Sequence, residues 1–289
     1  MRRGFDHLVL CVSDLDAAAS WYERCGFTTT PRARHDWGTD NRLVQLDGCF
    51  LEILTVGRPA LIPPHGERSF SFGAHNQAYL ARREGMSMLV FETADAAADR
   101  AEFAERGLPD VDDFYFERKA TLPDGEQVIV AFSLAFATDP RLTDAAFFCC
   151  QQHAPQYFWK PEFQRHANGA IGIDEVVMAA AEPDDWHEFF ARIQEPDSVT
   201  AAAGSLEVRT PRGTPRVLSP ETLRKRYPDT ELPEIDEGPV FVGFTVRVGS
   251  ANDTAARLDA NGIPHARDGR TLRIAPAAAY GCALELREG

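Results

Sequence analysis

The fold is decided by residues 14–27, DLDAAASWYERCGF, because this pattern returns twice more along the chain. Each copy opens with a residue that can cap a helix and reaches a glycine twelve residues later: Asp14 to Gly26, Asp95 to Gly107 and Ser250 to Gly262. About three alanine-rich turns lie between, and the glycine can end the helix in the left-handed conformation. The pattern predicts a strand–helix–strand unit that is used repeatedly.

The strands around these helices repeat as well. FDHLVL at residues 5–10 resembles IDEVVM at 173–178, and GCFLEI at 48–53 resembles GCALEL at 281–286. The first of these matches indicates one more block, in addition to the three that contain the capped helices. The helix of this block, near 184–193, lacks the closing glycine, because Pro196 stands in that place. The sequence therefore predicts four copies of a unit of roughly fifty to eighty residues.

Composition limits the partners that we expect. The 289 residues carry a net charge of -14, which disfavours nucleic acid and anionic membrane surfaces. No apolar stretch approaches the roughly 20 residues that span a bilayer, and a strand beginning near Phe5 leaves no room for a signal peptide. Six cysteines without a CxxC pair favour buried, reduced thiols, so we expect a cytoplasmic protein.

The blocks divide the chain as follows. A strand is expected at 5–12, a helix at 15–25 and further strands near 28–35, 42–47 and 49–56, with a second helix at 76–83 after a proline-rich connection. The predicted organisation is a first module at 1–57, a connection plus second module at 58–152, a connector at 153–169, and third and fourth modules at 170–289.

A strand, a helix and three strands, repeated four times, resembles the vicinal oxygen chelate superfamily of glyoxalases, bleomycin-resistance proteins and extradiol dioxygenases. The runs 6–12 and 51–53 are similar to that family's metal-binding strands, and 37–44 followed by 50–52 resembles its glyoxalase-like-domain branch. The resemblance implies an α+β fold in which four βαβββ modules pair into two half-open mixed-sheet barrels, with residues 1–152 as the first. It also implies a small-molecule site on the cupped inner face.

His7 and Glu52 are the candidate centre of that site. Strand alternation places His7 with Phe5, Val9 and Cys11 on one face, and Glu52 with its apolar neighbours on one face of the closing strand. A histidine and a carboxylate in an apolar cup are costly to bury unless they are paired or bind a metal. They suit one divalent transition ion, Fe, Mn, Ni, Co or Zn, that would polarise a substrate carbonyl.

The second module departs from the metal-binding pattern. Met88 stands at the position of His7, and the closing strand at 145–151 has no carboxylate. Gln151 is the candidate third ligand, although the family pattern does not predict it. A first barrel without a metal is therefore placed slightly ahead of a metal-loaded one. Glu52 could then be a base, or His7 and Glu52 could hydrogen-bond each other and line a neutral binding pocket.

Candidate substrate-binding residues surround this pair: His35, Trp37, Thr39, Asn41 and, in the connector, His153. In the resembling branch the first three would rim the cup, where Trp37 could stack on a substrate, and Asn41 could hydrogen-bond a carboxylate or carbonyl group. The second half offers Glu175 and Glu285 without a histidine, so a structural role is expected for it.

Three hypotheses remain open. The first is a metal-dependent lyase, isomerase or dioxygenase with His7 and Glu52 as ligands. The second is a metal-free protein that binds or sequesters a small molecule. The third is a metal-free enzyme in which Glu52 is the general base and His7 orients it. In each case the partner is a small molecule, and the protein is a monomer or homodimer.

Overall fold

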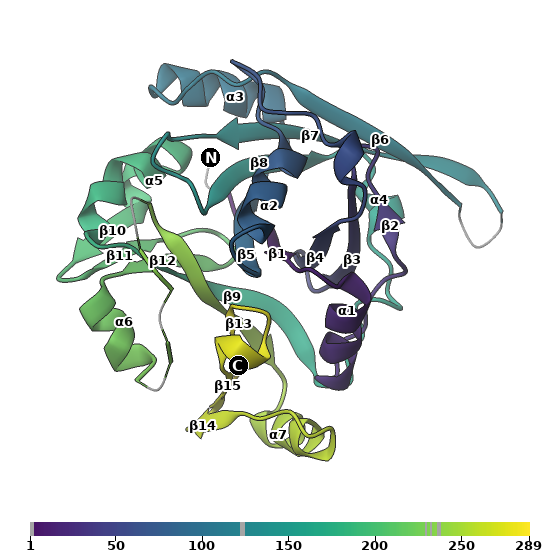
Figure 1. Cartoon of the computed structure of the whole chain (residues 1–289), viewed down its shortest axis with the longest axis vertical. Coiled ribbons are helices and arrows are strands. Elements are labelled where there is room, and N and C mark those ends of the chain that lie inside the picture. Colours follow the sequence, from purple (N-terminus) through teal and green to yellow (C-terminus); the bar gives the residue numbers. More distant parts are fainter. Residues whose placement is uncertain (1–2, 122–124, 229, 232, 236–237) are drawn as a thin grey trace.

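The computed structural model describes residues 3–121, 125–228, 230–231, 233–235 and 238–289. Its strands form two eight-stranded mixed sheets within these ranges (Figure 1). Sheet A has the order β2-β3-β4-β1-β5-β8-β7-β6, and sheet B has the order β10-β11-β12-β9-β13-β16-β15-β14. The predicted α+β fold of four modules paired into two half-open barrels is confirmed.

Sheet A is built by the first two modules. Its strands are β1 (Phe5–Cys11), β2 (Ala33–Arg34), β3 (Thr39–Gln45), β4 (Phe50–Val56), β5 (Gly85–Glu92), β6 (Phe114–Thr121), β7 (Gln127–Ala137) and β8 (Ala146–Gln152). The accompanying helices are α1 (Leu15–Arg24), η1 (Pro59–Leu61), α2 (Phe72–Leu80) and α3 (Ala96–Glu105). Within each module the first and last strands run parallel, and the two modules meet where β1 pairs antiparallel with β5.

The connector contains α4 (Pro155–Phe158) and leads to sheet B. The strands of sheet B are β9 (Ala170–Ala179), β10 (Val199–Ala202), β11 (Ser205–Val208), β12 (Thr214–Leu218), β13 (Val240–Val248), β14 (Ala266–Asp268), β15 (Thr271–Ile274) and β16 (Ala283–Glu288). Its helices are η2 (Pro183–Trp186), α5 (His187–Ile193), η3 (Pro196–Ser198), α6 (Pro220–Arg226), α7 (Ala251–Ala260) and η4 (Pro276–Ala278). The pairing of sheet A recurs, with β9 and β13 antiparallel at the centre.

The capping pattern that predicted the repeat is present in the structure. The side chains of Asp14, Asp95 and Ser250 each accept a hydrogen bond from a backbone N–H in the first turn of α1, α3 and α7. The closing glycines all have positive φ, +93° at Gly26, +83° at Gly107 and +63° at Gly262. These local signals therefore fix both ends of the three helices.

Two predicted elements are displaced. The strand expected at 28–35 is reduced to the two residues of β2, since Pro31 lacks the N–H that a ladder needs. The helix expected at 76–83 instead begins at Phe72, because the side chain of Ser71 accepts a hydrogen bond from the N–H of Ala74 and caps it earlier.

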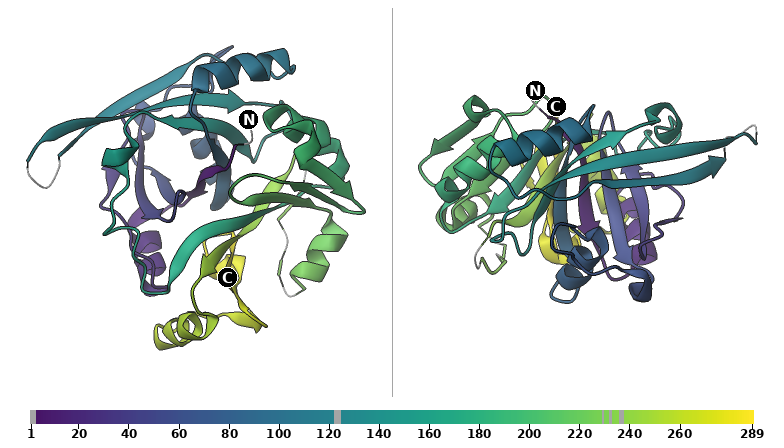
Figure 2. Two further views of the ribbon diagram at one scale, coloured as in Figure 1. Left: turned by 180° about the vertical axis from the view of Figure 1, so that it is seen from behind. Right: turned by 90° about the horizontal axis from the view of Figure 1, so that it is seen from above.

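The two sheets share one core. Buried side chains of β1 and β5 (Leu8, Leu89) belong to the same apolar cluster as those of β9 and β13 (Val176, Phe244), so the outer faces of the sheets pack back to back (Figure 2). Hydrogen bonds also connect the two halves. The side-chain amide of Gln194 accepts a hydrogen bond of 3.0 Å from the backbone N–H of Arg3 and donates one of 3.0 Å to its carbonyl oxygen.

We call the concave inner face of sheet A the cup. A second apolar cluster lines it, including Val9, Cys11, Leu54 and Val90. The expectation that Phe5 shares this face is wrong: Phe5 lies in the core between the two sheets, because the pairing of β1 with β5 shifts register between Phe5 and His7.

All six cysteines are free and buried, as predicted. In the described part of the chain, no helix is long and apolar enough to cross a membrane.

Candidate functional site in the cup of sheet A

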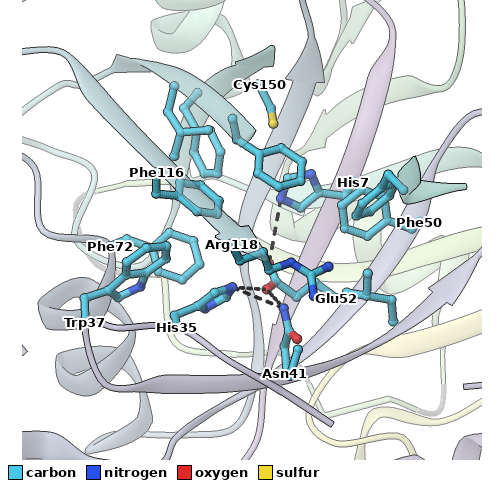
Figure 3. Close-up of a pocket in the computed structure, with 16 residues that line it drawn as sticks. His7, His35, Trp37, Asn41, Phe50, Glu52, Phe72, Phe116, Arg118 and Cys150 are labelled. Carbon is cyan, nitrogen blue, oxygen red and sulfur yellow. Dashed lines mark hydrogen bonds and ion pairs between the residues drawn. The ribbon is translucent and has the colours of Figure 1, made fainter. Parts of the chain in front are cut away.

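The cup contains a cavity with His7 of β1 and Glu52 of β4 at one end (Figure 3). His35, Trp37 and Asn41 reach it from the segment around β2 and β3. The apolar part of its wall consists largely of six aromatic rings: Phe50, Phe72, Phe116, Phe132, Phe148 and Phe158. The enclosed volume is about 60 Å³, which is room for a few water-sized groups.

Glu52 is a buried carboxylate held by polar groups on three sides. Asn41 donates a hydrogen bond of 2.5 Å from its Nδ2 to Oε1 of Glu52. The Nε2 atom of His7 lies 3.8 Å from the other carboxylate oxygen, and Nε2 of His35 lies 3.9 Å from Oε1 (Figure 3). Across the described residues, no arginine or lysine forms an ion pair with this carboxylate. Its nearest polar partners are therefore imidazole and amide groups, while Arg118 acts on it electrostatically without an ion pair.

Asp6 orients the imidazole of His7. The Asp6 carboxylate lies 2.5 Å from Nδ1 of His7, and its second oxygen accepts a hydrogen bond of 2.8 Å from Gln152. The register shift in β1 brings Asp6 to this position. An ionised carboxylate only accepts hydrogen bonds, so Nδ1 carries the proton and Nε2 faces Glu52. The ring also stacks on Phe50 with centroids 4.3 Å apart.

His35 forms the opposite wall beside Glu52. Its Nδ1 lies 2.8 Å from the hydroxyl of Thr39, and its ring stacks on Trp37 with centroids 4.4 Å apart. Burial lowers the pKa of His35, and the charge of Glu52 opposes this only in part. The imidazole is therefore neutral near pH 7, and with Nδ1–H directed at Thr39 its Nε2 accepts from the amide of Asn41 at 3.4 Å.

Arg118 reaches the cavity from β6 and faces Glu52 (Figure 3). Packing around the guanidinium lowers its pKa, which the Glu52 charge opposes, but an arginine remains protonated at any ordinary pH. Its side chain has no hydrogen-bond or ion-pair partner within the ranges that the structure describes. Phe116, two residues earlier on the same strand, packs edge-on against Trp37 at 4.8 Å.

Most of the sequence candidates converge on this cavity. His7, His35, Trp37, Asn41 and Glu52 line it. Thr39 supports it from behind through its hydrogen bond to His35.

Two candidates lie elsewhere. His153 bonds the hydroxyl of Ser133 at 2.8 Å and is not a lining residue. Gln151 accepts a hydrogen bond from the N–H of Ala96 and donates one to the carbonyl of Ala94, at the start of α3. Gln151 is therefore a helix cap, and the structure does not bring it to the other two predicted metal ligands.

Several residues that line the cavity were not predicted from the sequence. Phe116 and Arg118 come from β6, and the alternation of Phe114, Phe116 and Arg118 along this strand is the sequence signal that marks one of its faces. Phe158 belongs to a connector whose direction the sequence does not reveal. Cys150 also lines the cavity, where burial raises the pKa of its thiol well above the ordinary range, so it stays protonated.

The donor set does not fit a metal centre shared by both modules. The pairing of Val9 with Glu52 corresponds to that of Val90 with Phe148, so a phenylalanine stands where the second module would supply a carboxylate. Met88 stands at the place of His7, and its sulfur lies 3.9 Å from the amide of Asn76. Within the described ranges, no group of three or more His, Cys, Asp or Glu side chains could hold a metal ion.

The corresponding face of sheet B is neutralised by ion pairs. Arg226 contacts both Glu175 and Glu285, Arg216 donates to Glu175 at 2.7 Å, and Arg273 donates to Glu285 at 2.9 Å. These guanidinium groups occupy both carboxylates, which agrees with the structural role expected for the second half.

Comparison with solved structures finds the same fold at low identity. A hypothetical protein from Staphylococcus aureus has 11% identity and a TM-score of 0.67, with all of both chains covered. A mutant of 4-hydroxymandelate synthase from Streptomyces coelicolor has 12% identity and a TM-score of 0.54, covering 99% of this chain and 92% of that one. The 2,2',3-trihydroxybiphenyl 1,2-dioxygenase from Sphingomonas wittichii has 11% identity and a TM-score of 0.52, covering 100% of this chain and 91% of that one.

No curated protein matches the sequence. The family model described as "Glyoxalase-like domain" matches residues 5–194, which is more than half of the chain and includes all of sheet A. The chain therefore belongs to the glyoxalase-like domain family, as the resemblance in its strands predicted.

Proposed function

We propose that the cup of sheet A is the active site of a metal-free proton-transfer enzyme. In this proposal Glu52 removes a proton from a carbon that is activated by an adjacent carbonyl group. The observation that carries the proposal is the buried Glu52 carboxylate, which faces a small aromatic cavity and forms no ion pair with arginine or lysine among the described residues. A buried carboxylate that faces a cavity is positioned to accept a proton from a bound molecule.

The surrounding groups divide the two oxygens of Glu52 between them. Asn41 holds Oε1 through its hydrogen bond, which leaves Oε2 to accept the substrate proton. The C–H bond breaks, its electron pair moves into the carbonyl group as an enolate, and the proton stays on Glu52. Returning that proton to a different carbon completes an isomerisation, whereas loss of a leaving group from the enolate completes an elimination.

His7 assists as a proton relay. Asp6 keeps the proton on Nδ1, so the bare Nε2, 3.8 Å from Glu52, can take up the proton that Glu52 has collected. The aromatic wall limits the water around Glu52, and transfer to His7 allows the collected proton to exchange with solvent.

The test is solvent-deuterium exchange. Acetophenone, 2-butanone and 2-oxobutanoate each carry a C–H bond next to a carbonyl, and proton NMR in D2O follows its loss. We expect the wild type to accelerate exchange of at least one of them, and Glu52→Gln to lower that rate by about 100-fold or more. The matched control is Glu285→Gln, because Glu285 of β16 pairs with Thr245 as Glu52 of β4 pairs with Val9. Unchanged exchange in Glu52→Gln would contradict the proposal.

A binding protein without turnover is the second candidate, favoured by the enclosure of the cavity by aromatic rings. It predicts that small molecules bind at one site per chain, that chelator has no effect, and that none of the three probes exchanges. If exchange occurs but requires about one bound metal ion per chain and stops with chelator, the metal-dependent lyase, isomerase or dioxygenase hypothesis replaces both.

A further inference from the structure

Arg118 stands at the boundary between two spaces. It lines the enclosed cavity together with His35, Trp37 and Phe116, and the same four residues line an outer hollow of about 340 Å³ at the open side of the barrel. The hollow lies where the turn between β2 and β3 faces β6, an edge strand of sheet A, through the contact of Trp37 with Phe116. A molecule that reaches Glu52 from this hollow passes the guanidinium of Arg118.

Arg118 forms no ion pair with a described residue, in contrast to the arginines that surround the two carboxylates of the second half. On sheet B, Arg216, Arg226 and Arg273 all pair with carboxylates. Arg118 faces a carboxylate too, yet no ion pair with Glu52 or with any other described residue is formed. A guanidinium that lies beside an aromatic cavity and pairs with no carboxylate keeps its paired N–H donors available for an anion.

Charged side chains of both signs line the mouth of the cavity. Arg34, Arg118 and Lys119 line the outer hollow against the two acids Asp36 and Glu117. Of these acids, Glu117 accepts a hydrogen bond from Tyr115. Arg34 lies 3.8 Å from Asp40, so its charge is shared with a carboxylate. Arg118 is the basic residue that lines both the outer hollow and the inner cavity.

We propose that Arg118 selects substrates that carry a carboxylate, which it binds at the inner end of the outer hollow. The substrate is then an anionic carbon acid: its small reactive end enters the enclosed cavity of about 60 Å³ toward Glu52, and its larger part lies in the hollow. The guanidinium binds the two carboxylate oxygens side by side. Recognition of the anion does not depend on the proposed chemistry, whereas the orientation toward Glu52 rests on it.

The experiment compares two probes of nearly equal shape, phenylacetate and its neutral amide, phenylacetamide, by titration calorimetry with the full chain. We expect the wild type to bind phenylacetate at least about 10-fold more tightly than phenylacetamide, and Arg118→Met to remove this preference. Arg118→Lys should restore it in part, because an ammonium keeps the charge but not the paired donors. Arg270→Met is the control. Arg270 is an exposed residue beside β15, and replacing it removes the same charge from the other barrel.

Equal affinity for the two probes, binding of neither, or a preference that survives in Arg118→Met would overturn the assignment. So would an equal loss of preference in Arg270→Met, because the effect would then be one of overall charge. Glu52→Gln separates this inference from the proposed function. If the preference for phenylacetate depends on Arg118 while no probe undergoes deuterium exchange, the anion site stands and the proton-transfer proposal fails.

Discussion

Stability should fall steeply in mild acid because of one histidine on the helix that covers the cup. His75 of α2 is 8% exposed, its Nε2 has no partner among the described residues, and its ring packs against Phe70. Burial lowers the pKa of His75 from 6.5 to about 4. Below pH 6.5 the unfolded chain therefore binds a proton that the folded chain refuses, and stability decreases with falling pH until the folded-state pKa is reached.

The size of the effect follows from these two values. Each pH unit in which only the unfolded chain binds the proton costs about 1.4 kcal/mol. Between pH 7 and pH 4 the loss assigned to His75 is therefore about 3 kcal/mol, a large part of the stability of an ordinary domain. His75→Gln removes the titrating group and keeps a side chain that can hydrogen-bond.

The assay is urea unfolding of the wild type and His75→Gln at four pH values from 7 to 4, followed by circular dichroism. The quantity of interest is the difference between the two free energies of unfolding, since titrations common to both proteins cancel. We expect His75→Gln to gain about 3 kcal/mol on the wild type over this range, most of it below pH 6. Two curves that stay parallel to within about 0.5 kcal/mol would refute the reasoning.

Three further outcomes are expected. Burial alone would raise the pKa of Glu285, but Arg226 and its neighbours hold it below its ordinary 4.5. Glu285→Gln should therefore cost about 1.5–3 kcal/mol at pH 7, and the difference should shrink as pH falls below 4.5, in thermal unfolding. Elemental analysis of protein purified without chelator or affinity metal should find far less than one transition-metal ion per chain. About one ion per chain in the wild type and none in His7→Ala would contradict the conclusion that these side chains do not form a metal centre. Gly213→Ala should lose more than about 1 kcal/mol in urea unfolding, since φ is +77° there and a Cβ would collide with the ring of Phe5; a neutral effect would count against this packing between the halves.

Local signals in the sequence predicted the framework well, because they act within a few residues. Asp14 with Gly26, and the two equivalent pairs, define helix ends through hydrogen bonds that need no tertiary context. Alternation placed His7 with Val9 and Cys11 on one face of its strand and Glu52 on one face of another, and the family resemblance directed both into the cup. Where a local rule was missed, the element shifted: Ser71 caps α2 earlier than expected, and Pro31 interrupts the second strand.

The rest of the site depends on contacts between distant residues. Arg118 and Phe116 reach Glu52 only because sheet A curls until β6 faces the turn between β2 and β3, and strand periodicity alone does not state which face becomes concave. Asp6 approaches His7 through a register shift between two strands about eighty residues apart in the sequence. Gln151 was assigned to the site from its position near a strand end, whereas in the structure its side chain caps α3.

The sequence by itself determined the fourfold repeat, the helix ends and the strand face on which each of His7 and Glu52 lies, because capping, glycine conformation and strand alternation are properties of neighbouring residues. Only the tertiary structure decided which residues surround that pair and which charged side chains form ion pairs. The cup joins side chains from β1, β4, β6 and the segment around β2, and the same curl leaves Arg118 without an ion pair to a described residue, while arginines of the second half pair with its carboxylates. Such balances of charge and burial arise from the packing of whole sheets, so no short stretch of sequence contains them.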